Sequence, residues 1–152
     1  MSKFQSQIPA VESQRAVYIL NKQRGEENER RKQENVSREA AGQTPLDLLP
    51  QLTLGSGINT GISIVGMMGS DAHGLSYTVF GREVNLASRL EGISGRARII
   101  IGEHTYEDLK RDDPNLAASC IRLDAVTPKG FRAPVEIYEV PWKTEEMLAA
   151  EK

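Results

Sequence analysis

The segment from residue 24 to residue 39 restricts the fold of this chain more than any other stretch. It reads RGEENERRKQENVSRE, with five positive and five negative charges and Val36 as the single aliphatic side chain. Such a segment cannot bury enough apolar surface to offset its own ordering entropy. It is therefore either a solvated loop or an exposed helical extension, and its balanced charge favours a solvated surface over a binding site. The core must come from the rest of the chain.

The overall composition is that of an ordinary soluble globular domain. The 152 residues carry a formal net charge of −2, so no basic surplus indicates binding to nucleic acid. The apolar runs are far shorter than the ~20 residues that span a bilayer, and the first ten residues lack the apolar core of a signal peptide. Cys120 is the only cysteine, which fits a reducing compartment. We therefore expect a cytoplasmic location without direct membrane contact.

Apolar periodicity and breaker residues predict helices and strands in alternation. Residues 9–22 carry apolar side chains at helical spacing, and Pro9 is tolerated in a first turn. The later elements expected are strands at about 52–58 and 62–67 that turn at 59–61, a loop at 70–81 with a short extended piece at 77–80, a helix at 82–94, a strand at 97–102, a helix at 103–112, and a hairpin of strands at 120–130 and 133–142. This order predicts an α+β or α/β fold, and no internal repeat is apparent.

The helix expected at 82–94 carries two polar side chains that need an explanation. Asn85 and Arg89 are four residues apart, which places them on one helical face with their Cβ atoms roughly 5–6 Å apart. Leu86 and Leu90 would fix the opposite side of this helix against a sheet. Taken alone, an exposed polar pair is the simpler interpretation of the two side chains.

The residues that most often form metal or redox sites do not form one here. His73 and His104, together with Cys120, lack the spacing of a zinc site and are expected on the surface, in loops or, for the cysteine, as a small buried apolar residue. Trp142 is expected to anchor packing at the end of the last strand. The composition and periodicity alone therefore indicate an α+β domain and no particular chemistry.

Four stretches follow one another at short spacings in the second half of the chain. They read GINTGISIVGMMGS, YTVFGREVNLASRLE, ARIIIGEHTYEDL and PKGFRAPVEIYEV. Together they resemble the C-terminal half of the catalytic domain of class III adenylate and guanylate cyclases, with the G-x-x-V-N-x-A-x-R core at 81–89 as the most specific part. The resemblance covers about residues 52–142 and, more loosely, the helix at 9–22.

The resemblance implies a fold, a reaction and a mode of assembly. The fold would be a ferredoxin-like α+β core, and the active site would lie at a dimer interface. The reaction would convert ATP or GTP into the 3′,5′-cyclic monophosphate and pyrophosphate. Two divalent ions, Mg²⁺ or Mn²⁺, would activate the ribose 3′-oxygen and hold the phosphates.

The resemblance also implies a role for the polar pair. Arg89 matches the family arginine that contacts the α-phosphate as it becomes pentavalent, where a planar guanidinium offers paired donors to the growing charge. Asn85 matches the asparagine that orients the ribose for in-line attack. Asn85 could instead bond its own backbone near the helix start, and Arg89 could be a surface arginine.

Two further positions match less specifically. Thr78 matches the base-contacting position that follows the tyrosine, and a threonine there favours adenine over guanine. The alternative is a β-branched residue present for its strand propensity. Lys129 corresponds to a lysine that approaches the β- and γ-phosphates in some members, and it could equally be a turn lysine before Gly130.

The chain departs from the family because the metal-binding aspartates are absent. The family begins with a strand that carries one aspartate and continues with a hairpin that carries the second, and neither motif occurs here. We therefore expect one N-terminally incomplete cyclase domain over 1–152, a partial ferredoxin-like fold with a charged loop or insertion at 24–44 and the family-like core at 52–142. Alone it should be inactive.

The lost strands would leave apolar faces uncovered, so the chain should pair with a second copy, a strand-swapped partner or a complementary cyclase half. The leading interpretation is that it supplies the asparagine–arginine half of a cyclase site. The alternative is a non-catalytic cyclase-like module used for dimerisation or regulation. A third and weaker interpretation is an unrelated α+β binding domain.

Overall fold

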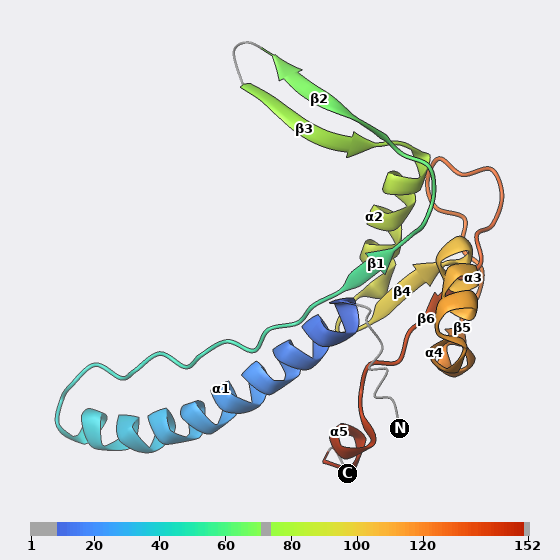
Figure 1. Ribbon diagram of the computed structural model, residues 1–152. Helices are drawn as coiled ribbons and strands as arrows, with labels where there is room; N and C mark the ends of the chain where they lie inside the picture. The colour runs from blue at the N-terminus through green and yellow to red at the C-terminus, as the bar shows by residue number, and fades with distance from the viewer. Residues whose placement is uncertain (1–8, 71–73, 151–152) are drawn as a thin grey trace.

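The computed structural model describes residues 9–70 and 74–150, and a four-stranded sheet forms the centre of this part of the chain (Figure 1). The sheet contains, in spatial order, β1 (Ser56–Ile58), β4 (Ile99–Gly102), β6 (Ile137–Glu139) and β5 (Ile121–Arg122). β1 runs parallel to β4, and the other neighbours are antiparallel. The mixed helices and strands confirm the expected α+β fold.

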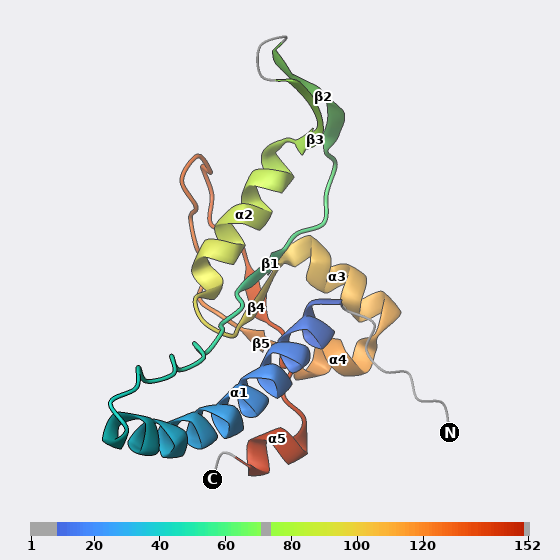
Figure 2. The ribbon, with the colours of Figure 1, turned by 90° about the vertical axis from the view of Figure 1, so that its left-hand side faces the viewer.

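Five helices accompany the sheet in the described residues. They are α1 (Pro9–Ala40), α2 (Arg82–Ser94), α3 (Glu103–Asp112), α4 (Pro114–Ser119) and α5 (Glu145–Ala149). Figure 2 shows α2 on one side of the sheet and α3 on the other. Among the described helices, none has an apolar stretch long enough to cross a membrane.

β4 is the centre of the core because both of its faces are covered. Ile99 and Ile101 pack with residues of α1, α3 and α4, whereas Ile100 packs with Leu86 and Leu90 of α2. All five side chains are buried. Consecutive buried isoleucines are typical of a strand between two layers of helices, and each such side chain stabilises the fold by about 1.5–3 kcal/mol.

α1 extends through the whole charged segment, so the helical alternative for residues 24–39 is confirmed and the loop alternative is wrong. The chain reverses at Gly42, and residues 43–52 run back beside the helix (Figure 1). We call residues 21–52 the helical arm. Most of this arm projects away from the sheet (Figure 2).

The helical arm contains a seven-residue polar repeat, so the expectation of no internal repeat is wrong. An asparagine recurs at every seventh position of α1, and each amide bonds both the N–H and the C=O of one residue in the returning chain. The pairs are Asn21 with Leu52, Asn28 with Leu49 and Asn35 with Leu46, at 2.6–2.9 Å. Three residues after each asparagine, an arginine donates to a further carbonyl, namely Arg24 to Pro50, Arg31 to Asp47 and Arg38 to Thr44.

The glycine-rich region folds differently from the prediction. β1 lies in the main sheet, and β2 (Ile64–Ser70) pairs instead with β3 (Gly74–Phe80), so the expected turn at 59–61 does not join two paired strands. The extended piece predicted at 77–80 is confirmed as part of β3, the loop predicted at 74–76 is wrong because these residues are also strand, and residues 71–73 lie outside the described residues. We call β2 and β3 together the hairpin arm, and it projects from the body at the N-terminal end of α2 (Figure 1).

The C-terminal part follows the prediction more closely. The helices at 82–94 and 103–112 and the final hairpin are confirmed, and the Trp142 indole is buried and donates to the Ala97 carbonyl at 2.7 Å. His104 is exposed but in the first turn of α3 rather than in a loop. Cys120 is half-buried, and burial raises the pKa of its thiol to about 11.

Two short helices were not predicted, although each has a local capping signal. The Asp113 carboxylate accepts the Leu116 N–H at the start of α4. The Thr144 hydroxyl accepts the Met147 N–H at the start of α5. Asp and Thr are common at this position because their oxygens satisfy first-turn N–H groups.

Candidate functional site

Helix α2 is held rigidly because one of its faces is buried in the core. Leu86, Leu90 and Ser94 are buried, while Asn85 and Arg89 are exposed on the opposite side. The helix also lies so close to β1 that a Cβ atom at Gly57 would overlap the α2 backbone. This close packing fixes the backbone of α2, and with it the direction in which the Cα–Cβ bonds of its exposed residues point.

A tight turn brings Lys129 to the same side of the molecule. Phe131 donates its N–H to the Pro128 carbonyl at 2.9 Å, and Pro128 is buried. Gly130 has a φ of +92°, which a type II turn requires at its third position and which L side chains rarely adopt. The turn therefore presents Lys129 at its exposed corner.

The exposed face of α2 and this turn enclose one cavity of about 610 Å³. Three of the four residues predicted as site residues line it: Asn85, Arg89 and Lys129. The remaining lining residues are Gly81, Arg82, Ser88, Gly130 and Phe131. The two walls are some forty positions apart in the sequence, so only the folded chain brings these side chains together.

The cavity is positively charged and contains unused donors. Its lining includes arginines and a lysine and no carboxylate. Across residues 9–70 and 74–150, the side chains of Asn85, Arg89 and Lys129 make no hydrogen bond or ion pair with the protein. Free donors beside concentrated positive charge suit an anionic ligand with several acceptor oxygens.

Thr78 is not brought into this cavity. It lies on β3, half-buried, where its register partner on β2 is Gly66. It is absent from the residues that line the cavity. The predicted contact between Thr78 and a base thus stays a prediction, since it requires a ligand or partner that also reaches the hairpin arm.

Sequence reasoning missed Arg82 as a site residue. Arg82 is three residues before Asn85 and seven before Arg89, so the three side chains share one helical face. Its guanidinium carbon lies 4.8 Å from the centre of the Phe131 ring, which places the cation over the ring face. The spacing of three, four and seven was visible in the sequence and could have indicated Arg82.

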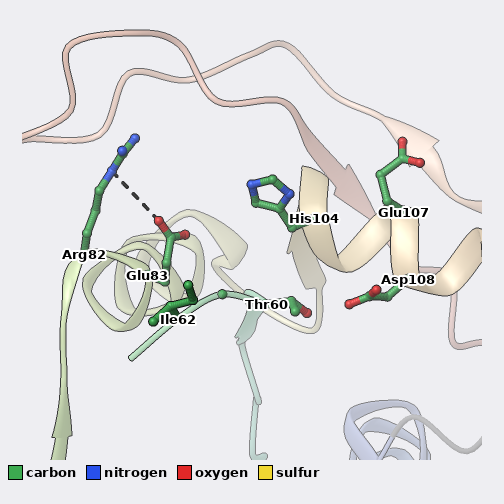
Figure 3. A pocket seen from close by; sticks show the side chains of 8 residues that line it. Thr60, Ile62, Arg82, Glu83, His104, Glu107 and Asp108 are labelled. Carbon is green, nitrogen blue, oxygen red and sulfur yellow. Dashed lines mark ion pairs between the residues drawn. The ribbon is translucent and has the colours of Figure 1, made fainter. Parts of the chain in front are cut away.

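A second cavity of about 530 Å³ is also lined by Arg82 and differs from the first because its lining includes carboxylates (Figure 3). Glu83 lines it from α2, and His104, Glu107 and Asp108 line it from α3. Its carboxylates already have partners. Glu83 accepts from Asn59 at 2.8 Å, Glu107 pairs with Lys110 at 2.6 Å, and Asp108 pairs with Arg111 at 2.9 Å.

Neither cavity has the ligands that a pair of divalent ions would need. Mg²⁺ and Mn²⁺ prefer carboxylate and carbonyl oxygens, whereas the first cavity offers mainly cationic donors. Within the part of the chain that the structure describes, no group of three or more His, Cys, Asp or Glu side chains is placed to hold a metal. The residues present therefore do not fit the ions that the resemblance implies.

Comparison with known proteins identifies the relatives of this chain. The profile of the adenylate and guanylate cyclase catalytic domain matches residues 14–140. The terminal-differentiation-specific adenylate cyclase of Dictyostelium discoideum is 40% identical over 89 residues, which are 57% of this chain and 4% of that protein.

Solved structures of two cyclases resemble the fold. The adenylyl cyclase CyaB from P. aeruginosa matches with 37% identity and a TM-score of 0.50, over 76% of this chain and 55% of that one. The guanylyl cyclase Cya2 matches with 27% identity and a TM-score of 0.50, over 95% of this chain and 64% of that one. The chain thus spans less than two thirds of the length of each of these relatives.

Proposed function

Because the chain belongs to the adenylate and guanylate cyclase catalytic domain family, we propose that it supplies the transition-state half of a nucleotide cyclase site. The observation that supports this proposal is the single cavity lined by Asn85, Arg89 and Lys129, in which no carboxylate competes for the donors. The substrate is a nucleoside triphosphate, and the products are the 3′,5′-cyclic monophosphate and pyrophosphate, in cyclic-nucleotide signalling.

In the proposed reaction, Arg89 stabilises charge that grows at the α-phosphate. The ribose 3′-oxygen loses its proton to solvent and forms a bond to the α-phosphorus, while the bond to pyrophosphate breaks. Negative charge accumulates on the equatorial oxygens during this exchange, and a guanidinium offers them two parallel N–H donors. The buried face of α2 fixes the helix from which Arg89 extends and leaves the guanidinium donors of Arg89 free.

Asn85 and Lys129 position the two ends of the substrate around this centre. Asn85 lies one turn before Arg89 and would bond the ribose, which aligns the attacking oxygen. Lys129 extends from the opposite wall and would hold the β- and γ-phosphates as a point charge. Both roles use side chains that the described part of the fold leaves without a partner.

The proposed nucleotide is ATP rather than GTP. Thr78 can donate to or accept from the edge of adenine, and the 40% identical Dictyostelium relative is named an adenylate cyclase. Since Thr78 lies outside the cavity, this contact would form when a partner places the base against the hairpin arm. The single cysteine makes the cytoplasm the proposed compartment.

The partner would be a second copy of this chain or a complementary cyclase half. β1 is at the edge of the described sheet and pairs only with β4, so its other side can accept a strand. Two Mg²⁺ or Mn²⁺ ions would reach the site on carboxylates of that partner, because the described residues of this chain include no fitting set.

The test is complementation. This chain is mixed with a cyclase domain that keeps both metal aspartates but has alanine in place of its own transition-state arginine, and cyclic AMP and cyclic GMP are measured with ATP or GTP and Mn²⁺. Cyclic AMP should appear only in the mixture. Arg89→Ala in this chain should lower the rate about 100-fold, since one such donor is worth roughly 3 kcal/mol.

Arg96→Ala is the matched control, because Arg96 is exposed and lies outside the cavity. The control should keep the full rate. If the two chains bind each other and neither cyclic nucleotide appears, the catalytic proposal is wrong and the alternative, a non-catalytic dimerisation or regulatory module, is favoured.

A further inference from the structure

The strongest unassigned feature is Arg82, which faces the same cavity as Asn85 and Arg89. Three residues on one helical face separated by three and four positions form a continuous polar stripe. Seven residues of helix place the Cα atoms of Arg82 and Arg89 about 10 Å apart along the axis. Their side chains can therefore contact different parts of one elongated anion.

The guanidinium of Arg82 is positioned by an aromatic ring rather than by an acid. Its carbon lies 4.8 Å from the centre of the Phe131 ring, and this stacking leaves the N–H groups at its rim available. Its nearest described carboxylate is that of Glu83, at 4.0 Å from Nε. The Arg82 side chain is 74% exposed, so this long contact is weak.

The positive charges that line the cavity favour a ligand with more than one phosphate. Arg82 and Arg89 on α2 and Lys129 on the facing turn contribute three cations with no carboxylate among the lining residues. Phe131, which holds Arg82, is two residues after Lys129 in the same turn. Arg82 therefore contacts the turn that carries Lys129, whereas Arg89 lies about two helical turns further along α2.

We propose that Arg82 binds the terminal phosphates of a polyphosphate ligand, together with Lys129. This inference deepens the proposed function, since it rests on the same cavity, and it names a substrate-binding residue that the family resemblance did not supply. A polyphosphate alone should bind, because the contacts are to phosphate oxygens and not to a base. Phe131 acts as a positioning residue for Arg82.

The first test measures binding of inorganic tripolyphosphate and of AMP to the chain by calorimetry without metal. Arg82→Gln should weaken tripolyphosphate binding about tenfold, since a charged hydrogen bond is lost, and should leave AMP binding unchanged. The tripolyphosphate affinity of Arg82→Lys should fall between those of the unchanged chain and Arg82→Gln, because lysine keeps the positive charge but loses the paired N–H donors of the guanidinium. Arg96→Gln, outside the cavity, should bind as the unchanged chain does.

Phe131→Leu separates positioning from contact. It keeps the apolar bulk but removes the ring face, so tripolyphosphate binding should weaken several-fold with Arg82 present and not at all in the Arg82→Gln background. Equal tripolyphosphate affinities for Arg82→Gln and Arg96→Gln would overturn the inference. Thermal melting of each variant checks that the fold is kept, and Arg82→Lys supplies the comparison if Arg82→Gln does not fold.

The outcome is separable from that of the proposed function. In the complementation assay, Arg82→Gln should raise KM for ATP about tenfold with little change in kcat, whereas Arg89→Ala lowers kcat. If Arg82→Gln loses tripolyphosphate binding and the mixture shows no cyclase activity, the anion-binding role of Arg82 is supported and the proposed cyclase function is wrong. If Arg82→Gln has full activity and an unchanged KM for ATP in the mixture, the proposed cyclase function is supported and the proposed role of Arg82 is wrong.

Discussion

The two arms that project from the body of this domain differ in the polarity of their exposed surfaces and in how their backbone groups are bonded. The surface of the helical arm is mostly polar, with Val36, Leu48 and Leu52 as its exposed large apolar side chains, and side chains of α1 bond backbone groups of the returning chain. The two strands of the hairpin arm pair with each other in seven register pairs, but the arm has two open strand edges and exposes apolar side chains. A projecting element can thus satisfy its polar groups within itself, or it can have an exposed apolar surface and open strand edges that need a partner.

The helical arm can bond its two segments to each other because the spacing of the asparagines along α1 matches the spacing of their partners along the returning chain. Seven residues of α-helix rise about 10.5 Å, and three residues of extended chain cover roughly 9–10 Å. An asparagine on every second turn therefore meets every third residue of the returning chain. The repeat uses only the carbonyl of Pro50, so a residue without an N–H fits at that position.

The hairpin arm is incomplete because one of its faces is entirely apolar. The alternation of strand side chains places five exposed residues together on that face, namely Val65, Met67, Leu75, Tyr77 and Val79. The opposite face is mixed, with the exposed apolar side chains of Ile64 and Met68 beside small and polar residues such as Gly66, Ser76 and Thr78. A two-stranded ribbon with such a face is marginal in water without a covering partner.

The largest effect is expected from charging the apolar face of the hairpin arm. Met67 and Tyr77 are register partners, so Met67→Lys combined with Tyr77→Glu keeps an attractive cross-strand pair while it removes the apolar surface. Association with a second copy or a cyclase half should weaken about 100-fold or more, because both charges would have to be desolvated. Sedimentation velocity measures this change.

The matched control places the same charges on the opposite face. Met68 and Ser76 are also register partners, so Met68→Lys with Ser76→Glu changes net charge and pairing in the same way. This variant should associate within a few-fold of the unchanged chain. Equal losses for the two double variants would show that the apolar face is not the interface.

A smaller effect is expected from removing one asparagine of the helical arm. Asn28→Ala leaves the N–H and the C=O of Leu49 without their partners, which lie at 2.7 and 2.9 Å. Two hydrogen bonds of about 1 kcal/mol each predict a loss of about 1–2 kcal/mol in the free energy of unfolding of the arm. Hydrogen exchange at the Leu49 amide should accelerate accordingly, while association through the hairpin arm stays the same.

Lys32→Ala is the control for this prediction. Lys32 lies on the same stretch of α1 and makes an exposed pair with Glu29. Its loss should change the free energy of unfolding by less than about 0.5 kcal/mol. Unchanged exchange at Leu49 in the Asn28 variant would contradict the proposed role of the polar repeat.

The sequence predicted α2 well because the signals for it are local. The buried stripe of Leu86 and Leu90 and the opposite pair of Asn85 and Arg89 both follow from helical spacing. Their shared cavity with Lys129 did not follow from spacing, because a turn forty positions later provides the other wall. The family resemblance supplied that residue, and the fold brought it to α2.

The two arms were predicted poorly for different physical reasons. Apolar periodicity cannot detect the helical arm, since its repeat consists of Asn21, Asn28 and Asn35 and their arginines. The hairpin was misassigned because β1 pairs with β4, more than forty residues later in the sequence, rather than with its neighbour. Strand pairing of this kind depends on long-range packing under α2, which local turn signals do not contain.

The smallest effect is an acid response limited to the helical arm. Hydrogen bonds from Arg30, and next from Arg31, lower the pKa of the Glu27 carboxyl from 4.5 to about 2. Because the folded arm binds the proton less well than the unfolded chain, this contribution to stability is present above pH 4.5 and is lost as the pH falls towards 2. The Arg30 side chain is exposed and those of Glu27 and Arg31 lie half-buried at the surface, so screening keeps the effect small and salt reduces it further. The carboxyl chemical shift of Glu27 should titrate near pH 2, and Glu27→Gln should remove that part of the acid response in the helical content. The hairpin arm has no carboxylate among its described residues, so the same substitution should leave association at pH 7 unchanged. A Glu27 midpoint near 4.5 would show that the arginines do not hold this carboxylate in solution.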